Sequence, residues 1–88
     1  MKVENMRSSN GNKVPNQFII TDSENRIEYF QSYQTIIAKI DKRQVYLDSD
    51  KWDYSRTTGK YRNQFLGETK KETQRKIDSG EYILANLN

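Results

Sequence analysis

The order of apolar and polar residues from Gln17 onward predicts a series of short β-strands. Residues 18–20 form an apolar run of β-forming types, and residues 26–33 alternate between two faces. The polar cluster at residues 22–25 separates these segments and has the composition of a turn, with Asn25 suited to a positive φ angle. The two segments therefore predict a first β-hairpin.

Two further β-rich segments follow. Residues 35–40 are rich in β-branched types, residues 41–43 can turn the chain, and residues 44–47 can return it. The pattern predicts a four-stranded antiparallel meander. A helix from Ser32 to Ile40 is the alternative, and the β-branched residues in this stretch weigh against it without excluding it.

The pattern becomes helical after the strands. Ser55 is suited to cap a helix over residues 56–66, which a glycine ends. Thr69 and Glu72 have the spacing of a capping box, which predicts a second helix over residues 70–78. This second helix is so polar that it must lie on the surface with a narrow contact.

These elements define the expected domain organisation. Residues 1–16 are polar and lack periodicity, so we expect a flexible N-terminal arm. Residues 17–88 are expected to form a single α+β domain, with an antiparallel sheet of four to five strands and one or two short C-terminal helices. Residues 81–87 are either the fifth strand or an extended closing segment. The predicted core is Phe18, Ile20, Tyr29, Ile37, Val45, Leu47, Trp52, Tyr61, Phe65, Leu66, Ile77 and Ile83.

Composition limits the chemistry that this chain can perform. It has no cysteine and no histidine, which removes disulfides, thiolate metal sites and the commonest general base. Asp48, Asp50 and Asp53 are close in sequence, but turn formation explains them better than a calcium loop does. Residues 55–60 lack the glycine spacing of a phosphate-binding loop. We therefore expect a protein that is not an enzyme and has no cofactor and no metal.

The charge is unevenly distributed along the chain. The net charge is +3, yet residues 39–76 hold eleven Lys and Arg against six Asp and Glu. Residues 56–67 contain three cations and no acid, which favours an anionic partner. No segment has the apolar length of a signal peptide or a membrane span, so we expect a soluble cytoplasmic protein without a membrane partner. The sequence leaves the oligomeric state open.

Aromatic and basic residues alternate between residues 46 and 65, and this stretch gives the candidate site. Aromatic rings beside fixed cations can stack on bases and neutralise phosphates. The large indole of Trp52 is expected in the core, because this chain is short of aliphatic residues. The candidate residues for binding nucleic acid or another partner are Tyr54, Arg56, Lys60, Tyr61, Arg62, Lys70 and Lys71. The sequence does not tell whether these side chains share one face.

Several short strings give the chain a resemblance to a known family. These are FQSY at residues 30–33, WDYS at 52–55, TT at 57–58, KYR at 60–62, FLG at 65–67 and SGEY at 79–82. The chain resembles a family of small proteins without an assigned activity that phages, plasmids and integrative elements of Gram-positive bacteria encode. The resemblance covers roughly residues 13–88 and implies a genomic setting rather than a catalytic site.

These observations lead to two hypotheses for function. The first is a nucleic-acid-binding accessory protein of a phage or mobile element that uses the basic and aromatic residues. The second is a protein-directed inhibitor of a host defence system, similar to an anti-CRISPR protein. Tyrosine, tryptophan and arginine are the residues that interface hot spots use. A DNA mimic is disfavoured because the net charge is positive.

Overall fold

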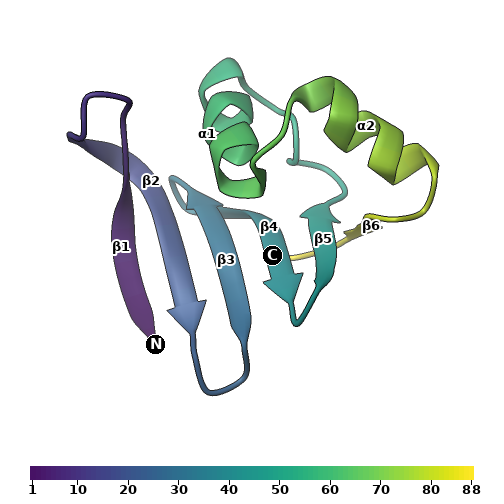
Figure 1. Cartoon of the computed structure of the whole chain (residues 1–88), viewed down its shortest axis with the longest axis horizontal. Coiled ribbons are helices and arrows are strands. Elements are labelled where there is room, and N and C mark those ends of the chain that lie inside the picture. Colours follow the sequence, from purple (N-terminus) through teal and green to yellow (C-terminus); the bar gives the residue numbers. More distant parts are fainter.

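Six β-strands form one sheet, and their order in space is their order along the chain (Figure 1). The computed structural model describes all 88 residues. The strands are β1 (Lys2–Arg7), β2 (Lys13–Asp22), β3 (Ile27–Ser32), β4 (Thr35–Asp41), β5 (Gln44–Asp48) and β6 (Ile83–Ala85). The α+β class is confirmed, and the sheet has one strand more than the largest number that the sequence predicted.

Strands β1 to β5 form an antiparallel meander, as the pattern of apolar and β-forming residues predicted for β2 to β5. The alternative helix from Ser32 to Ile40 is excluded, because this stretch is a tight turn followed by β4. Tyr33 lies in this turn with a φ of 56°. In the preceding hairpin the positive φ falls on Arg26, one residue after the predicted Asn25.

Two helices follow β5 and lie over one end of the sheet, where the first of them packs against β3 and β4 (Figure 1). Helix α1 (Arg56–Leu66) has Ser55 as its N-cap and ends at Gly67, which adopts the left-handed conformation with a φ of 70°. Helix α2 (Lys70–Asp78) begins with the predicted capping box, in which Thr69 and Glu72 exchange hydrogen bonds. Both helix predictions are therefore confirmed. The chain then returns as β6, which pairs in parallel with β5.

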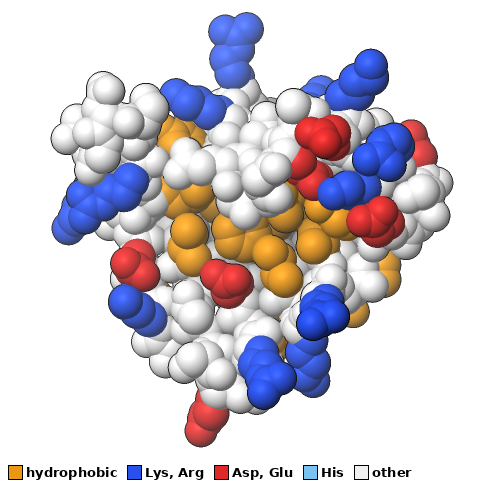
Figure 2. Space-filling view, viewed as in Figure 1, with side chains coloured by type: hydrophobic (Ala, Val, Ile, Leu, Met, Phe, Trp, Pro, Cys, Tyr) orange, Lys and Arg blue, Asp and Glu red, His pale blue; other side chains and the backbone are white.

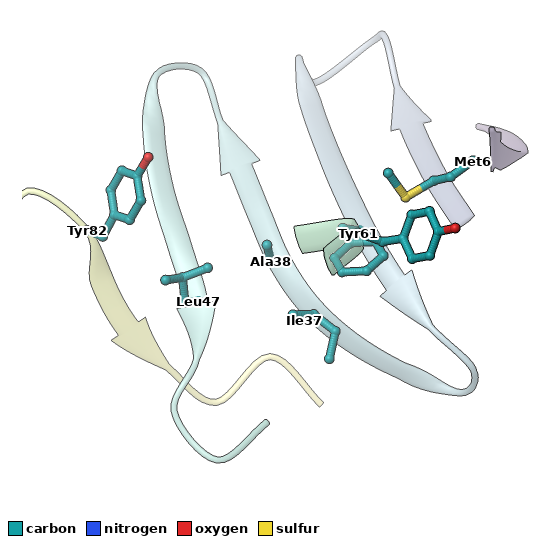
Figure 3. Close-up of a cluster of buried hydrophobic side chains, with 7 residues drawn as sticks. Met6, Ile37, Ala38, Leu47, Tyr61 and Tyr82 are labelled. Carbon is teal, nitrogen blue, oxygen red and sulfur yellow. The ribbon is translucent and has the colours of Figure 1, made fainter. Parts of the chain in front are cut away.

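The buried core lies between the sheet and α1. It extends from Met6 on β1 to Tyr82 just before β6 (Figure 3). The seven buried apolar residues are Met6, Phe30, Ile37, Ala38, Leu47, Tyr61 and Tyr82. Of the predicted core, Ile37, Leu47 and Tyr61 are confirmed as buried. The predicted residues Val45, Trp52, Phe65, Leu66 and Ile77 are partly buried and pack against this cluster.

The sequence assigned the wrong face of β3 to the core. Phe30 is 0% exposed, whereas the predicted Tyr29 is half-buried on the opposite face. Phe18 and Ile20 share that opposite face, because their cross-strand partners are Gln31 and Tyr29. Apolar residues occupy both faces of these strands, and a period of two residues identifies the faces without saying which one the helices cover.

The prediction of a flexible arm over residues 1–16 is wrong. This segment forms β1 and the start of β2, paired by backbone hydrogen bonds. Met6 fixes β1 to the core, since its side chain is 2% exposed. An edge strand draws its order from pairing with a neighbour, so a largely polar sequence is compatible with it.

The other edge of the sheet also differs from the prediction. Residues 81–87 contain a strand, but it is only three residues long, and Ile83 is 41% exposed rather than in the core. No strand lies beyond β6 to cover its outer edge.

Asp48 connects the end of β5 to the C-terminal tail. Its buried carboxylate accepts hydrogen bonds from the backbone N–H groups of Asp50 and Lys51, at 3.3 and 3.0 Å. The other oxygen accepts from the backbone N–H of Leu87 at 2.9 Å and from the Asn88 side chain at 3.2 Å. Asp48 therefore stabilises a turn, as the sequence predicted. It also holds the C-terminal tail against the end of β5.

Figure 2 shows the arrangement of side chains on one face of the molecule. Apolar side chains gather in a band across the middle, while lysine and arginine side chains project around the rim. No helix in the structure is long and apolar enough to cross a membrane.

Candidate nucleic-acid interface

A shallow depression of about 650 Å³ lies where the start of α1 approaches the start of α2. We call it the basic depression. It is lined by Asp53, Tyr54, Ser55, Arg56, Gly59, Lys60, Arg62, Asn63 and Lys70. Four of these nine residues are basic and one is acidic, so the depression carries a surplus of positive charge. It contains five of the seven residues that the sequence proposed as a site.

The periodicity of α1 places one row of residues along the basic depression. Arg56, Lys60 and Asn63 are four and three residues apart, so they lie on one face of the helix. Ser55 sets the start of this face, because its hydroxyl accepts a hydrogen bond from the N–H of Thr58 at 3.1 Å. Arg56 and Lys60 are exposed and form no ion pair. Their charges are therefore available to an anion.

Basic residues are ordinarily exposed, but Arg62 is buried and differs in this from the other basic residues of the depression. Its side chain is 1% exposed, and its guanidinium lies 5.0 Å from the centre of the Trp52 ring. Nη1 donates to the carbonyl of Trp52 at 2.8 Å and to Oδ1 of Asp53 at 3.0 Å. Nη2 donates to Oδ1 of Asn63 at 2.9 Å. Arg62 thus fixes the loop before α1 and forms the floor of the basic depression.

Asp53 links the two helices through this floor. Its Oδ2 lies 2.6 Å from Nζ of Lys70 at the start of α2, while its Oδ1 contacts Arg62. Partial burial of Asp53 opposes its ionisation, but the hydrogen bonds from Lys70 and Arg62 outweigh this effect and lower its pKa. The single acid in the basic depression is therefore ionised and already paired.

The two aromatic candidates, Tyr54 and Tyr61, also differ in how exposed they are. Tyr54 is 44% exposed at the rim of the basic depression, and Nζ of Lys51 lies 5.6 Å from the centre of its ring. Tyr61 is 6% exposed and belongs to the core, and Nζ of Lys60 lies 5.5 Å from the centre of its ring. Of the two rings, only Tyr54 presents a surface on which a base could stack.

Lys70 and Lys71 do not contribute equally. Lys70 lines the basic depression, whereas the exposed Lys71 lies on the outer surface of α2. Sequence reasoning missed Asp53 and Asn63 as site residues. The position of Asn63 was available from the helical period, seven residues after Arg56. The pairing of Asp53 with Arg62 and Lys70 depends on the tertiary fold.

A second polar cluster joins α2 to the segments before and after it, around a buried carboxylate. Glu68 has a side chain that is 5% exposed and accepts hydrogen bonds from Nζ of Lys76 and the hydroxyl of Tyr82, both at 2.8 Å. Thr73 also donates to it. Partial burial opposes ionisation of Glu68, but these three hydrogen bonds outweigh it and lower its pKa.

Tyr82 experiences the opposite shift in the same cluster. Burial first, and then its contact with Glu68, raise the pKa of Tyr82 to about 12. The cluster joins the segment after α1 to the segment before β6, with its charges paired inside the protein. It therefore has the features of a structural connection. The structure contains no group of three or more acidic side chains that could hold a metal ion.

Comparison with known proteins places the chain in a family. The model of a family of unknown function, DUF8033, matches residues 1–81. The match covers most of the chain, including β1, and the chain belongs to this family. No curated protein and no solved structure matches the chain.

Proposed function

We propose that this member of the DUF8033 family is a non-enzymatic binding protein that holds nucleic acid at the basic depression. The observation that carries the proposal is the grouping of Arg56, Lys60 and Lys70 around one shallow surface whose only acid is already paired. Exposed lysine and arginine side chains bind the phosphate groups of nucleic acid through charge and hydrogen bonds.

The geometry supports a division of roles among these residues. Arg56 and Lys60 form no ion pair, so each can contact a phosphate without first breaking an existing interaction. Lys70 shares its charge with Asp53 and would contribute less. Tyr54 lies beside them with an exposed ring, which suits a base that is not stacked inside a duplex. We therefore expect single-stranded nucleic acid to bind more tightly than a duplex.

The same surface supports a second candidate function. Tyr54 and Arg56 are adjacent and exposed, and tyrosine and arginine are the residues that dominate protein interfaces. An acidic surface on another protein would suit the basic depression. The resemblance to proteins of phages and mobile elements supports such a setting, in which a target within a host defence system is the candidate partner.

The decisive experiment is a fluorescence-anisotropy titration with labelled single-stranded and double-stranded DNA and RNA across a salt series. The test variant is Arg56→Ala with Lys60→Ala. The matched control is Arg43→Ala with Lys42→Asn, which also removes one arginine and one lysine but from the β4–β5 turn. Asparagine is used at position 42 because Lys42 has a φ of 56°.

We expect the wild-type affinity to fall steeply with salt, because phosphate contacts release counterions. The slope of log K against log salt is negative. Loss of two such contacts in the test variant makes it shallower by roughly 1.4–1.8. The control should stay close to the wild type. Equal losses in both variants would mean that binding follows net charge rather than the basic depression. No binding at low salt would reject nucleic acid as the ligand and direct the search to a protein that is captured from nuclease-treated lysate.

A further inference from the structure

We propose that the face of the sheet opposite the helices is a self-association surface, on which a second copy of this chain packs. The register of the strands aligns one row of side chains across all six of them on this face. In order from β1 to β6, the row is Val3, Ile20, Tyr29, Lys39, Tyr46 and Ile83. Five of the six are apolar or aromatic.

The helices do not cover this row. Helix α1 packs on the face of Phe30 and Ser32, where the Ser32 hydroxyl lies 2.9 Å from that of Thr58. Tyr29 alternates with these residues along β3 and therefore points to the other side. At the two ends of the row, Val3 is 62% exposed and Ile83 is 41% exposed. A row on a small protein that is apolar or aromatic at five of its six positions, and exposed at both ends, marks an interaction surface.

The order of residues in the row favours a second copy as the occupant. Consider a two-fold axis that runs parallel to the strands and passes between β3 and β4. It places the row of one copy against the same row of the second copy, running in the opposite direction. Val3 then faces Ile83 of the second copy, and Ile20 faces Tyr46 of the second copy. Tyr29 faces Lys39 of the second copy, which is a favourable cation–π pair. Every position meets a compatible one.

Charge disfavours the other simple arrangement, although Asp41 lies 4.0 Å from Lys39 of its own chain. A two-fold axis along the row would place Lys39 directly against Lys39 of the second copy, where two like charges repel. The strand-parallel axis also keeps the strands of the two sheets nearly aligned, which is a common geometry for packed sheets. Two acidic residues of this face, Asp22 and Asp41, lie in a row to one side, with Ile27 between them. That row forms part of a polar rim.

The size of this face determines how tightly we expect the dimer to form. A row across six strands is about 24 Å long, because neighbouring strands lie about 4.8 Å apart. With the rows on either side, the face offers roughly 500 Å² per copy, so a dimer buries about 1,000 Å², near the lower limit for a specific interface. We therefore expect a dissociation constant on the order of 10 μM.

Sedimentation velocity of the intact protein from about 1 to about 500 μM, a range that brackets this value, tests the proposal. We expect a concentration-dependent dimer in the wild type. Val3→Lys with Ile83→Lys should give a monomer, because the two new cations face each other across the interface. Both positions are exposed, so circular dichroism should show an unchanged fold. Asn10→Lys with Gln74→Lys adds the same charge at exposed sites outside the row and should remain dimeric.

A charge exchange identifies the geometry. Val3→Glu with Ile83→Lys puts opposite charges face to face only if residue 3 of one copy meets residue 83 of the other. This variant should recover the dimer, and the recovery should weaken at high salt. A wild type that stays monomeric throughout the range overturns the proposal. A dimer that persists in Val3→Lys with Ile83→Lys also overturns it, because such a dimer uses another surface. The proposal is independent of nucleic-acid binding, because the basic depression belongs to the helix layer.

Discussion

Two ionic clusters connect the helices to the rest of the molecule, and they differ in which partner is buried. In the first cluster the buried ion is a cation, Arg62, which is paired with Asp53. In the second the buried ion is an anion, Glu68, which is paired with Lys76 and bonded to Tyr82. Both clusters join separate segments of the chain, and each holds one ion away from water.

The difference between the clusters lies in the charge that remains. Glu68 and Lys76 balance each other inside the protein, so nothing is left for a ligand. Asp53 is shared between Arg62 and Lys70, which leaves a surplus positive charge beside the unpaired Arg56 and Lys60. A balanced cluster stabilises the fold, whereas an unbalanced one at the surface also attracts anions. This contrast is the physical basis for placing the candidate site at the first cluster.

The largest effect that separates the clusters is expected from Arg62→Ala. This change leaves Asp53 with only Lys70 and removes the cation from the Trp52 ring. Removing one partner of a buried pair costs about 3–5 kcal/mol in the free energy of unfolding. Urea denaturation measures this loss. Arg56→Ala is the control and should change stability by less than about 0.5 kcal/mol. Similar losses in both variants would mean that Arg62 is not held as described.

The contrast between Arg56 and Arg62 also shows the limits of sequence reasoning. The helix around them was predictable, because the caps at Ser55 and Gly67 are local signals. The exposure of Arg56 followed from its residue type. The burial of Arg62 did not, because it depends on Trp52 folding over the helix from ten residues earlier in the chain. Residue type gives the average environment, and tertiary packing gives the exception.

The strands also show which features the sequence predicts and which depend on the tertiary fold. The pattern of apolar residues predicted β2 to β5, through alternation in β3 and runs of β-forming residues in the other strands. It did not predict β1, whose order comes from pairing with β2 and from the single anchor Met6. It also did not predict which face of the sheet the helices cover, so Tyr29 was expected in the core in place of Phe30. The residues misplaced in this way form much of the proposed self-association surface.

A smaller loss of stability is expected from Glu68→Gln. The amide oxygen can still accept from Tyr82, but Lys76 loses its counter-ion and one charge-assisted hydrogen bond is gone. The expected decrease is about 1–3 kcal/mol in the free energy of unfolding, again by urea denaturation. Because Glu68 lies outside the basic depression, affinity for nucleic acid should not change. A larger loss here than in Arg62→Ala would reverse the proposed ranking of the two clusters.

The smallest effect is the dependence of stability on pH, and it distinguishes the clusters by their titrating groups. Asp53 and Glu68 both have pKa values lowered by folding from ordinary values of 3.8 and 4.5. Their contributions are present above those values and are lost as the pH falls through the lower, folded pKa values. Acid therefore weakens both clusters. Asp53→Asn and Glu68→Gln should each reduce the acid dependence.

Alkaline pH affects only the second cluster. Folding raises the pKa of Tyr82 from 10.0 to about 12, so its contribution is complete below pH 10.0 and is lost as the pH rises toward 12. The unfolded chain loses the phenolic proton first, and stability falls by less than about 1.4 kcal/mol per pH unit from this group. Tyr82→Phe removes the proton and should make the alkaline limb of a plot of unfolding free energy against pH less steep. The remainder comes from Lys76, because its hydrogen bond to Glu68 raises its pKa, and the acid limb persists through Asp53. An alkaline limb as steep as that of the wild type would show that Glu68 does not hold the Tyr82 hydroxyl protonated, and the second cluster would then lose its distinguishing feature.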